Sequence, residues 1–235
     1  MAKSSVVTKP RDILGNSALR PDGAHKVQGS FEFTSDLHAE NMLWGATLRS
    51  PHPYAKIMSI DTSAALALPG VHCVITADDV PGKSTYGLIS SDQPVFASDY
   101  VRYMGEPVAA VAADHPETCR RALALIVVIY EVLAPLTNPE DAIAGSFDPI
   151  HPDGNVIRHQ RIIRGDQNIS GPIVVEGEYV IGMQDQAFLG LEAALATPDP
   201  DGLGLHLHVA TQWLHEDLTQ ISACLSLPAE KIRLT

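Results

Sequence analysis

PVAAVAADHPETCRRALALIVVIYEV, residues 107–132, predicts a strand, a helix and a second strand in succession. Residues 107–113 are a compact apolar run of the kind that a sheet buries on both faces. Asp114 and Glu117 have the spacing of a capping box, so we expect them to begin the helix. Its buried stripe has the spacing i, i+3, i+4 and i+7 and consists of Cys119, Ala122, Leu123 and Ile126. Residues 127–132 are again apolar and complete the unit.

A similar alternation precedes this stretch. Short β-type runs occupy residues 43–48, 55–60 and 71–76. Residues 61–63 offer N-cap chemistry for a short helix before the third run, and Pro69 ends that helix. Residues 84–95 show no periodicity and are expected to form a loop. The sequence therefore predicts a mixed α/β (α+β) domain, which we place at residues 23–144.

Three further segments flank this domain. Residues 1–22 are polar and non-periodic, so we expect an arm. Residues 145–172 are interrupted by Pro and Gly and are expected to be a linker. A second unit is expected at residues 173–235, with strands at 173–181, 192–197, 203–210 and 232–235. Its helix has an apolar stripe that consists of Leu214, Leu218, Ile221 and Leu225.

The chain of 235 residues is acidic, with 16 Lys and Arg against 28 Asp and Glu and a formal net charge of −12. This sign disfavours a nucleic-acid-binding protein, because neutralising phosphates requires a basic face. The longest apolar run, residues 122–130, is far shorter than the ~20 residues of a membrane span, so we expect no membrane partner. The three cysteines lack CxxC spacing, which favours reduced thiols and a cytoplasmic protein.

Three polar patterns leave alternatives open. The DPDG sequence at 199–202 is similar to the start of a calcium loop but lacks the later glutamate, so we expect a hairpin turn. His206 and His208 share a strand face at a spacing that metals use, although no third ligand is close in sequence. Gln184, Asp185 and Gln186 form either an ordinary polar turn or a loop whose amide projects into a pocket.

Two ordered sets of motifs resemble the molybdenum hydroxylases, the xanthine dehydrogenase and aldehyde oxidase family. The first set is GATLRSPHPYAKI (45–57), IDTSAA (60–65), PGV (69–71), TADDVPG (76–82), GEPVAAVAA (105–113) and YE (130–131). These stretches are similar to the family's α/β hammerhead domain. The second set is EGEY (176–179), QDQAFL (184–189) and ATQWLH (210–215). It resembles the beginning of the molybdopterin-binding domain, most of all in the bacterial xanthine dehydrogenase type of subunit.

The resemblance implies a molybdenum–molybdopterin cofactor, in its mononucleotide or dinucleotide form, that is held by the pterin dithiolene and by no protein metal ligand. By position, Gln184 matches the glutamine whose amide hydrogen-bonds an oxygen ligand of the molybdenum, and Gln212 is a second candidate cofactor-binding residue. The implied reaction is the oxidative hydroxylation of purines, from hypoxanthine and xanthine to urate. Electrons would leave through 2Fe–2S clusters and FAD, on partner subunits or domains, to NAD.

Three departures from the family pattern limit these expectations. Gln186 replaces a histidine that many members have, and Gly190 follows where others often have Glu or Pro. The family's Gly-Gly-x-Phe-Gly-Gly stretch, the substrate-orienting arginine and the general-base glutamate have no counterpart up to Thr235. We therefore expect no catalytic residue in this chain. We expect the chain to be the N-terminal part of a molybdenum subunit and to be inactive alone. We also expect the enzyme to be a higher oligomer with iron–sulfur and FAD subunits.

Two alternative functions remain on the sequence alone. One is a non-catalytic assembly or docking fragment. The other keeps the family but replaces the purine with an aldehyde, carbon monoxide or another N-heterocycle, because the pocket residues that separate these substrates would lie elsewhere.

Overall fold

The computed structural model describes residue 17 and residues 19–145, 147–151, 154–156, 158–169, 171–188 and 190–235. Strand β7 (Pro107–Ala113) is the centre of the first sheet, between β1 (Trp44–Arg49) and β3 (Val71–Ile75), and it is antiparallel to both. β7 has the small apolar residues of a buried strand, and Val108, Ala109, Val111 and Ala113 are all buried. The predicted strand at 107–113 is therefore confirmed.

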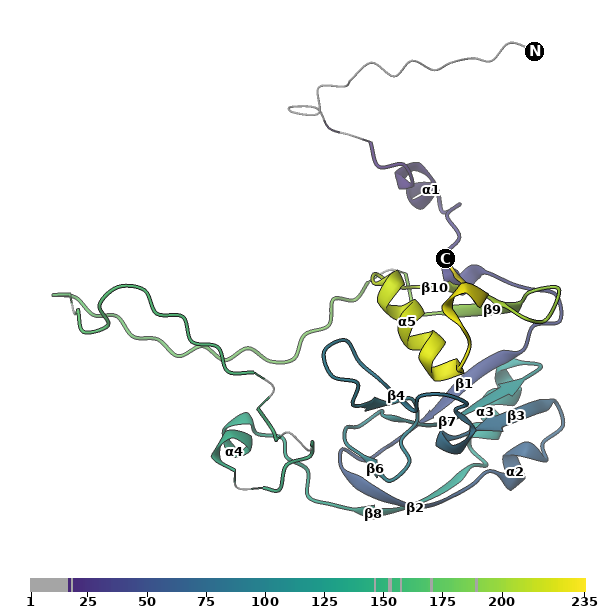
Figure 1. The fold of residues 1–235 in the computed structure, drawn as a ribbon, viewed down its shortest axis with the longest axis horizontal. Helices are drawn as coiled ribbons and strands as arrows, with labels where there is room; N and C mark the ends of the chain where they lie inside the picture. The colour runs from purple at the N-terminus through teal and green to yellow at the C-terminus, as the bar shows by residue number, and fades with distance from the viewer. Residues whose placement is uncertain are drawn as a thin grey trace, which may run out of the picture.

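Helices α2 (Ser63–Leu66) and α3 (Pro116–Leu123) pack on this sheet (Figure 1). The predicted stripe of α3 is confirmed in the core, where Cys119 and Ala122 are buried beside Val111. The helix begins one residue later than predicted, because His115 is the N-cap and its Nδ1 atom accepts a hydrogen bond from the Glu117 amide at 3.1 Å. The Asp114 amide instead donates to the Gly70 carbonyl at 3.0 Å, so the expected capping box does not form.

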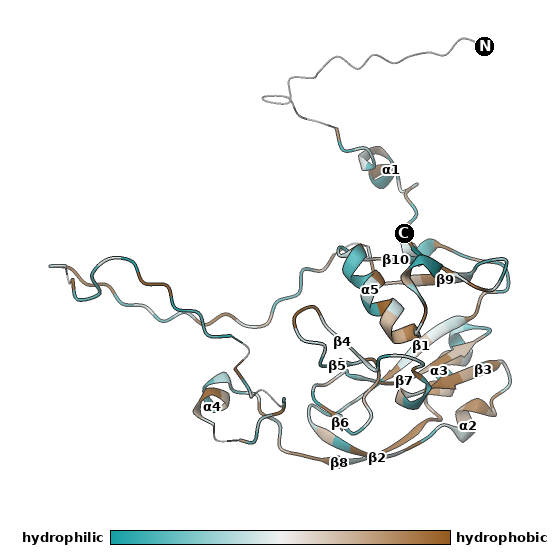
Figure 2. Cartoon of the chain, viewed as in Figure 1, coloured by the Kyte–Doolittle hydropathy of each residue, from teal (hydrophilic) through white to brown (hydrophobic). Residues whose placement is uncertain are grey.

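A second sheet has the order β6-β2-β8, with β2 (Ala55–Asp61) between β6 (Tyr100–Val101) and β8 (Val127–Val132). Its core cluster consists of Ala55, Ile57, Ala97, Val101 and Val108. Figure 2 shows the hydrophobic residues of this unit gathered on the strands of the two sheets. The predicted α/β fold class is thus confirmed, with short helices on antiparallel sheets.

One carboxylate is enclosed in this unit. Glu106 is 1% exposed, and its Oε2 atom accepts a hydrogen bond of 2.5 Å from the backbone amide of Arg102. The Ser50 amide donates to the Glu106 carbonyl at 2.9 Å, and the Gly105 amide donates to the Ser50 carbonyl at 2.9 Å. Glu106 therefore stabilises the turn between β6 and β7 and fixes that turn to the end of β1.

The stretch at 84–95 is more ordered than the expected loop. β4 (Thr85–Tyr86) and β5 (Gln93–Pro94) pair there as a short antiparallel ladder. The remaining short elements of the chain are α1 (Gly23–Gln28), η1 (Thr34–Asp36), η2 (Ala77–Asp79), α4 (Pro139–Ala144) and η3 (Ala229–Lys231).

A third sheet follows, with the order β11-β10-β9. β9 (Ala194–Pro198) and β10 (Leu205–Val209) are antiparallel, and the Gly202 amide donates to the Asp199 carbonyl at 2.8 Å, which confirms the hairpin turn. α5 (Leu214–Leu225) then connects β10 to the parallel strand β11 (Ile232–Leu234). The predicted helix is confirmed. The predicted last strand pairs with β10, and its residue Ile232 is buried.

The strand predicted at 173–181 is wrong for this structure. Its described residues have no regular secondary structure, and Val175 and Tyr179 are 89% and 90% exposed. The chain between the first unit and β9 instead runs out and back as an extended excursion (Figure 1). The reason is that an alternating pattern forms a strand only beside a partner strand, and no described strand pairs with these residues.

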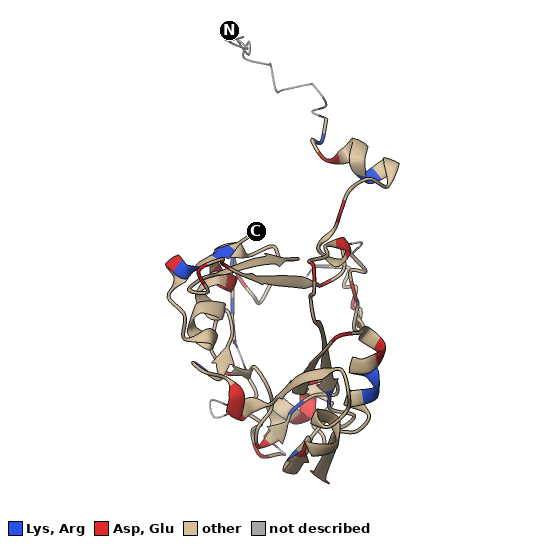
Figure 3. Cartoon of the chain, turned by 90° about the vertical axis from the view of Figure 1, so that its right-hand side faces the viewer, with Lys and Arg blue, Asp and Glu red and all other residues tan. Residues whose placement is uncertain are grey.

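Charged residues are spread over the units and do not gather on one face of the view in Figure 3. Within the described part of the chain, no helix has the length and apolar character that crossing a bilayer requires.

Candidate functional site

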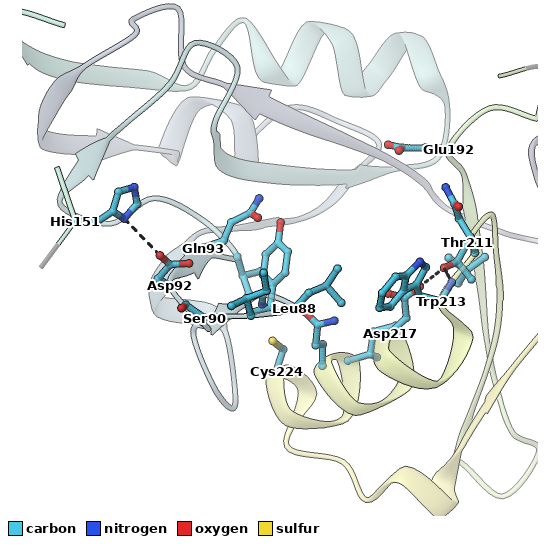
Figure 4. A pocket seen from close by; sticks show the side chains of 18 of the residues that line it. Leu88, Ser90, Asp92, Gln93, His151, Glu192, Thr211, Trp213, Asp217 and Cys224 are labelled. Atoms are coloured by element: carbon cyan, nitrogen blue, oxygen red, sulfur yellow. Dashed lines mark hydrogen bonds and ion pairs between the residues drawn. The ribbon is translucent and has the colours of Figure 1, made fainter. Parts of the chain in front are cut away.

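A cavity of about 1610 Å³ lies where the third sheet and α5 meet the first unit. Four parts of the chain line it: the β4–β5 hairpin, described residues from 150 to 156, the residues Phe188, Gly190 and Glu192, and residues around the beginning and one side of α5. Figure 4 shows Leu88 and Gln93 from the hairpin on one side, and Trp213, just before α5, with Asp217 from α5 on the other. The hairpin and α5 thus lie on opposite sides of the cavity.

The turn before α5 is fixed by its own side chains. The Thr211 hydroxyl donates to the Asp217 carboxylate and accepts a hydrogen bond from the Trp213 amide at 3.0 Å (Figure 4). The Asp217 amide in turn donates to the Trp213 carbonyl at 3.0 Å. Gln212 lies inside this bonded turn and lines the cavity, so the position of its backbone is tied to the beginning of α5.

The described lining is neutral to acidic. It contains Asp92, Glu192 and Asp217 but no Lys or Arg among the residues that the structure describes. Burial raises the pKa of the Tyr86 phenol and of the Cys224 thiol, so both groups are neutral at pH 7. The cavity therefore suits a largely neutral, hydrogen-bonding group better than an isolated phosphate, because the described lining offers no Lys or Arg for charge-assisted hydrogen bonds.

The structure separates the two predicted cofactor-binding residues. Gln212 lines the cavity, whereas Gln184 is exposed on the stretch without secondary structure and is not among the described lining residues. Phe188 and Gly190, further along the same stretch, do reach the lining. The role of Gln184 stays a prediction from the resemblance.

The two histidines of β10 lie elsewhere. The ring centroids of His206 and His208 are 4.2 Å apart, and His206 Nε2 is 2.9 Å from the hydroxyl of Thr235. Burial, followed by the charge of His208, lowers the pKa of His206. Among the described residues, no group of three or more His, Cys, Asp or Glu is placed to hold a metal ion. The pair therefore lacks the third ligand that a metal site would need.

Sequence reasoning missed the residues that connect α5 to the hairpin. The Gly87 amide donates to Gln220 Oε1 at 2.9 Å across 133 positions of sequence. The amides of Gly82 and Lys83 donate to the carbonyls of Cys224 and Ala223, both at 2.9 Å. Only the Pro-Gly pair at 81–82 marks this position in the sequence, and such a pair predicts no more than the end of a helical turn.

Two family models match the chain. The model described as "Aldehyde oxidase and xanthine dehydrogenase, a/b hammerhead domain" matches residues 28–134. The model described as "Molybdopterin cofactor-binding domain" matches residues 150–235. The cavity lies between the parts of the chain that the two models match, with residues 86–95 in the first and the rest of the described lining in the second.

Named relatives span much more than this chain. A Bacillus subtilis (strain 168) protein, named as a probable subunit of xanthine dehydrogenase, is 36% identical over 97% of this chain and 30% of its own length. The nicotinate dehydrogenase large molybdopterin subunit of Eubacterium barkeri is 32% identical over 96% of this chain and 54% of its own length. The chain thus spans about a third to a half of these relatives.

Two solved structures have similar folds. The aldehyde oxidoreductase of Desulfovibrio gigas superposes with a TM-score of 0.82 and 29% identity, over 92% of this chain and 26% of that chain. Quinoline 2-oxidoreductase of Pseudomonas putida 86 also gives a TM-score of 0.82, with 30% identity over 94% of this chain and 30% of that chain. The order of a hammerhead domain followed by a cofactor-binding domain is therefore shown for this chain at the level of fold and family.

Proposed function

This chain belongs to the xanthine dehydrogenase and aldehyde oxidase family of molybdenum hydroxylases, and we propose that it is the N-terminal part of the molybdenum-cofactor subunit of a xanthine dehydrogenase. The reaction proposed for the whole enzyme is the oxidative hydroxylation of hypoxanthine and xanthine to urate. The observation that carries the proposal is the 36% identity to the Bacillus subtilis protein over 97% of the chain. We further propose that the domains divide at residues 23–144 and 173–235, with a linker between them.

The cavity supports a binding role for Gln212. A side-chain amide both donates and accepts hydrogen bonds, and the bond from the Thr211 hydroxyl to the Asp217 carboxylate keeps the turn that contains Gln212 in place. This donor set fits the neutral pterin ring and the oxygen ligands of a molybdenum centre, and it offers no cation to the cofactor's phosphate. When bound, the cofactor supplies the redox chemistry of hydroxylation, and the protein supplies its binding and orientation.

For Gln184 the proposal rests on the resemblance. Its amide would donate to an oxygen ligand of the cofactor, where a fixed dipole stabilises developing negative charge at little cost of reorganisation. The residue would tune turnover, because one such contact accounts for only part of the rate enhancement.

We also propose partners and a location. Electrons would pass to an iron–sulfur subunit and an FAD subunit and then to NAD, within a higher oligomer. The proposed location is the cytoplasm, where the free thiols of Cys73, Cys119 and Cys224 would stay reduced.

A second substrate class has support from the relatives. The nicotinate dehydrogenase subunit is almost as similar to this chain as the xanthine dehydrogenase protein, at 32% against 36% identity. Nicotinate is another N-heterocycle, so the family's reaction fits it as well. Sequence identity therefore favours the purine by a narrow margin.

The test uses the complete subunit purified with its partners. Elemental analysis is expected to find molybdenum, and NAD reduction is measured with xanthine, nicotinate and an aldehyde in parallel. The proposal predicts the largest kcat/KM with xanthine. A preparation that contains molybdenum but has a larger kcat/KM with nicotinate or the aldehyde would contradict the proposed substrate class. A preparation that oxidises xanthine without molybdenum would contradict the proposed cofactor.

A further inference from the structure

We propose that residues 82–87 are a joint that fixes α5 on the hammerhead unit, which is the part of the chain that the hammerhead model matches (residues 28–134). Gly82 is the positioning residue of that joint. The joint holds the turn at residues 211–213, which we call the Gln212 turn, in the position at which Gln212 lines the cavity. Only this last step rests on the function proposed above, because the contacts that form the joint are independent of any cofactor.

The first attachment is at the end of α5. The last carbonyls of a helix have no donor within the helix, so they need partners from outside it. The Leu227 amide donates a hydrogen bond to the Ser222 carbonyl at 3.1 Å, and Ser226 ends the helix with a left-handed φ of 52°. The next two carbonyls, those of Ala223 and Cys224, accept from the amides of Lys83 and Gly82 at 2.9 Å. The hammerhead unit thus completes the C-terminal cap of a helix in the other unit.

The second attachment is one turn earlier. Gln220 is half-buried, and its Oε1 atom accepts from the Gly87 amide at 2.9 Å, while its Nε2 atom donates to the Glu216 carbonyl at 3.3 Å. Two attachments along a rigid helix fix its rotation as well as its position. α5 packs beside β4 in this arrangement (Figure 1).

The opposite end of α5 carries the Gln212 turn. A helix rises about 1.5 Å per residue, so the 12 residues of α5 span roughly 18 Å from the joint to that turn. A rotation of about 5° at the joint would displace the turn by roughly 1.5 Å over that length. A misplacement of about 1 Å is enough to slow an enzyme substantially.

Glycine is required at position 82 because the backbone at the end of α5 lies very close to it, and not because of its own backbone angles. A Cβ atom on Gly82 would lie 2.1 Å from the Ala223 carbonyl oxygen and 2.8 Å from both the Cys224 oxygen and the Ser226 nitrogen. These are backbone atoms that cannot rotate away. Gly82 is not among the described glycines with positive φ, so alanine would fit its local conformation. Gly82→Ala therefore tests the contact with α5 alone.

The experiment compares Gly82→Ala with Gly45→Ala in the complete enzyme. Gly45 is a matched control, because a Cβ there would meet no atom within 4 Å. We expect backbone amides of residues 210–225 to exchange hydrogen about tenfold faster in Gly82→Ala than in the wild type, with exchange in β7 unchanged. Turnover per bound molybdenum is expected to fall at least fivefold, and Gly45→Ala is expected to match the wild type in both readouts.

A second pair of variants keeps the test decisive if Gly82→Ala does not fold. Gln220→Glu retains an acceptor for the Gly87 amide, and Gln220→Leu removes it. The joint predicts fast exchange in α5 for the leucine variant and slow exchange for the glutamate variant. Equal exchange in all variants and the wild type overturns the joint, and faster exchange with unchanged turnover overturns its positioning role. A wild-type enzyme without molybdenum would refute the proposed function, while the exchange readout would still decide the joint.

Discussion

Replacement of Glu106 tests how much one enclosed carboxylate stabilises the hammerhead unit. The side chain is 1% exposed and accepts the Arg102 amide at 2.5 Å, within the turn that joins β6 to β7. Glu106→Ala removes that acceptor and leaves a void. Glu106→Gln keeps the size of the side chain and a carbonyl oxygen that can accept the same amide.

The two variants differ in expected cost. Hydrogen bonds to charged groups contribute about 1.5–3 kcal/mol, and a buried donor left without a partner costs about 1–3 kcal/mol. The one deleted methylene adds roughly 0.8 kcal/mol, the contribution of a buried CH₂. Because these contributions overlap, we expect Glu106→Ala to lower the free energy of unfolding by about 3–4 kcal/mol and Glu106→Gln by about 1 kcal/mol.

Urea unfolding followed by far-ultraviolet circular dichroism measures both costs. Glu131→Ala is the control, because Glu131 is exposed on β8 and its loss should change stability by less than about 0.5 kcal/mol. If Glu106→Ala unfolds at the same urea concentration as Glu131→Ala, the enclosed hydrogen bond does not stabilise the turn. If Glu106→Gln is as unstable as Glu106→Ala, the acceptor oxygen is not what matters.

Three further predictions concern thiols, a glycine and pH. In the native protein a disulfide reagent should label exposed Cys73 first, half-buried Cys224 more slowly, and buried Cys119 only on unfolding, whereas equal labelling of Cys73 and Cys119 would contradict the packing of α3. Gly70→Ala should cost about 1–2 kcal/mol in urea unfolding, because Gly70 has a φ of 88°, and a stability equal to that of wild type would contradict this strain. The bond from Arg120 lowers the pKa of Glu117, so its stabilising contribution is complete above the unfolded pKa near 4.5 and is lost as pH falls through the lower folded value. The difference in stability between wild type and Glu117→Gln should therefore shrink as the solution is acidified through that range, and a difference that grows would refute the pairing.

Local sequence predicted the elements whose signals are complete within a few residues. Strands β7 and β8 have the predicted bounds, because each is a short, largely apolar run that local sequence identifies as a strand. The prediction placed the cap of α3 at Asp114, whereas the structure has it at His115. Local sequence does not separate these two positions, since either side chain can accept a hydrogen bond from an early helix amide. The carboxyl group of Asp114 lies beside Gly70 instead, a contact that no local pattern encodes.

Long-range contacts decided the rest. β4 and β5 contain two residues each, too few for any periodicity, and the alternating stretch at 173–181 has no described partner strand. The cavity is a product of tertiary structure, since it needs the hairpin, the chain near 150–156 and α5 together. The resemblance predicts Gln212 as a cofactor-binding residue, but it contains no signal for the contact between Gly87 and Gln220.

We propose that Gln184 contacts the molybdenum cofactor in the complete enzyme. The most direct measurement is xanthine-dependent turnover per bound molybdenum in the complete enzyme, for Gln184→Ala and for the exposed control Gln167→Ala. Removal of one such donor typically slows turnover by about 10²–10³-fold, so we expect a loss up to that size for Gln184→Ala with unchanged molybdenum content, and no loss for the control. Equal turnover of the two variants and the wild type would contradict the claim.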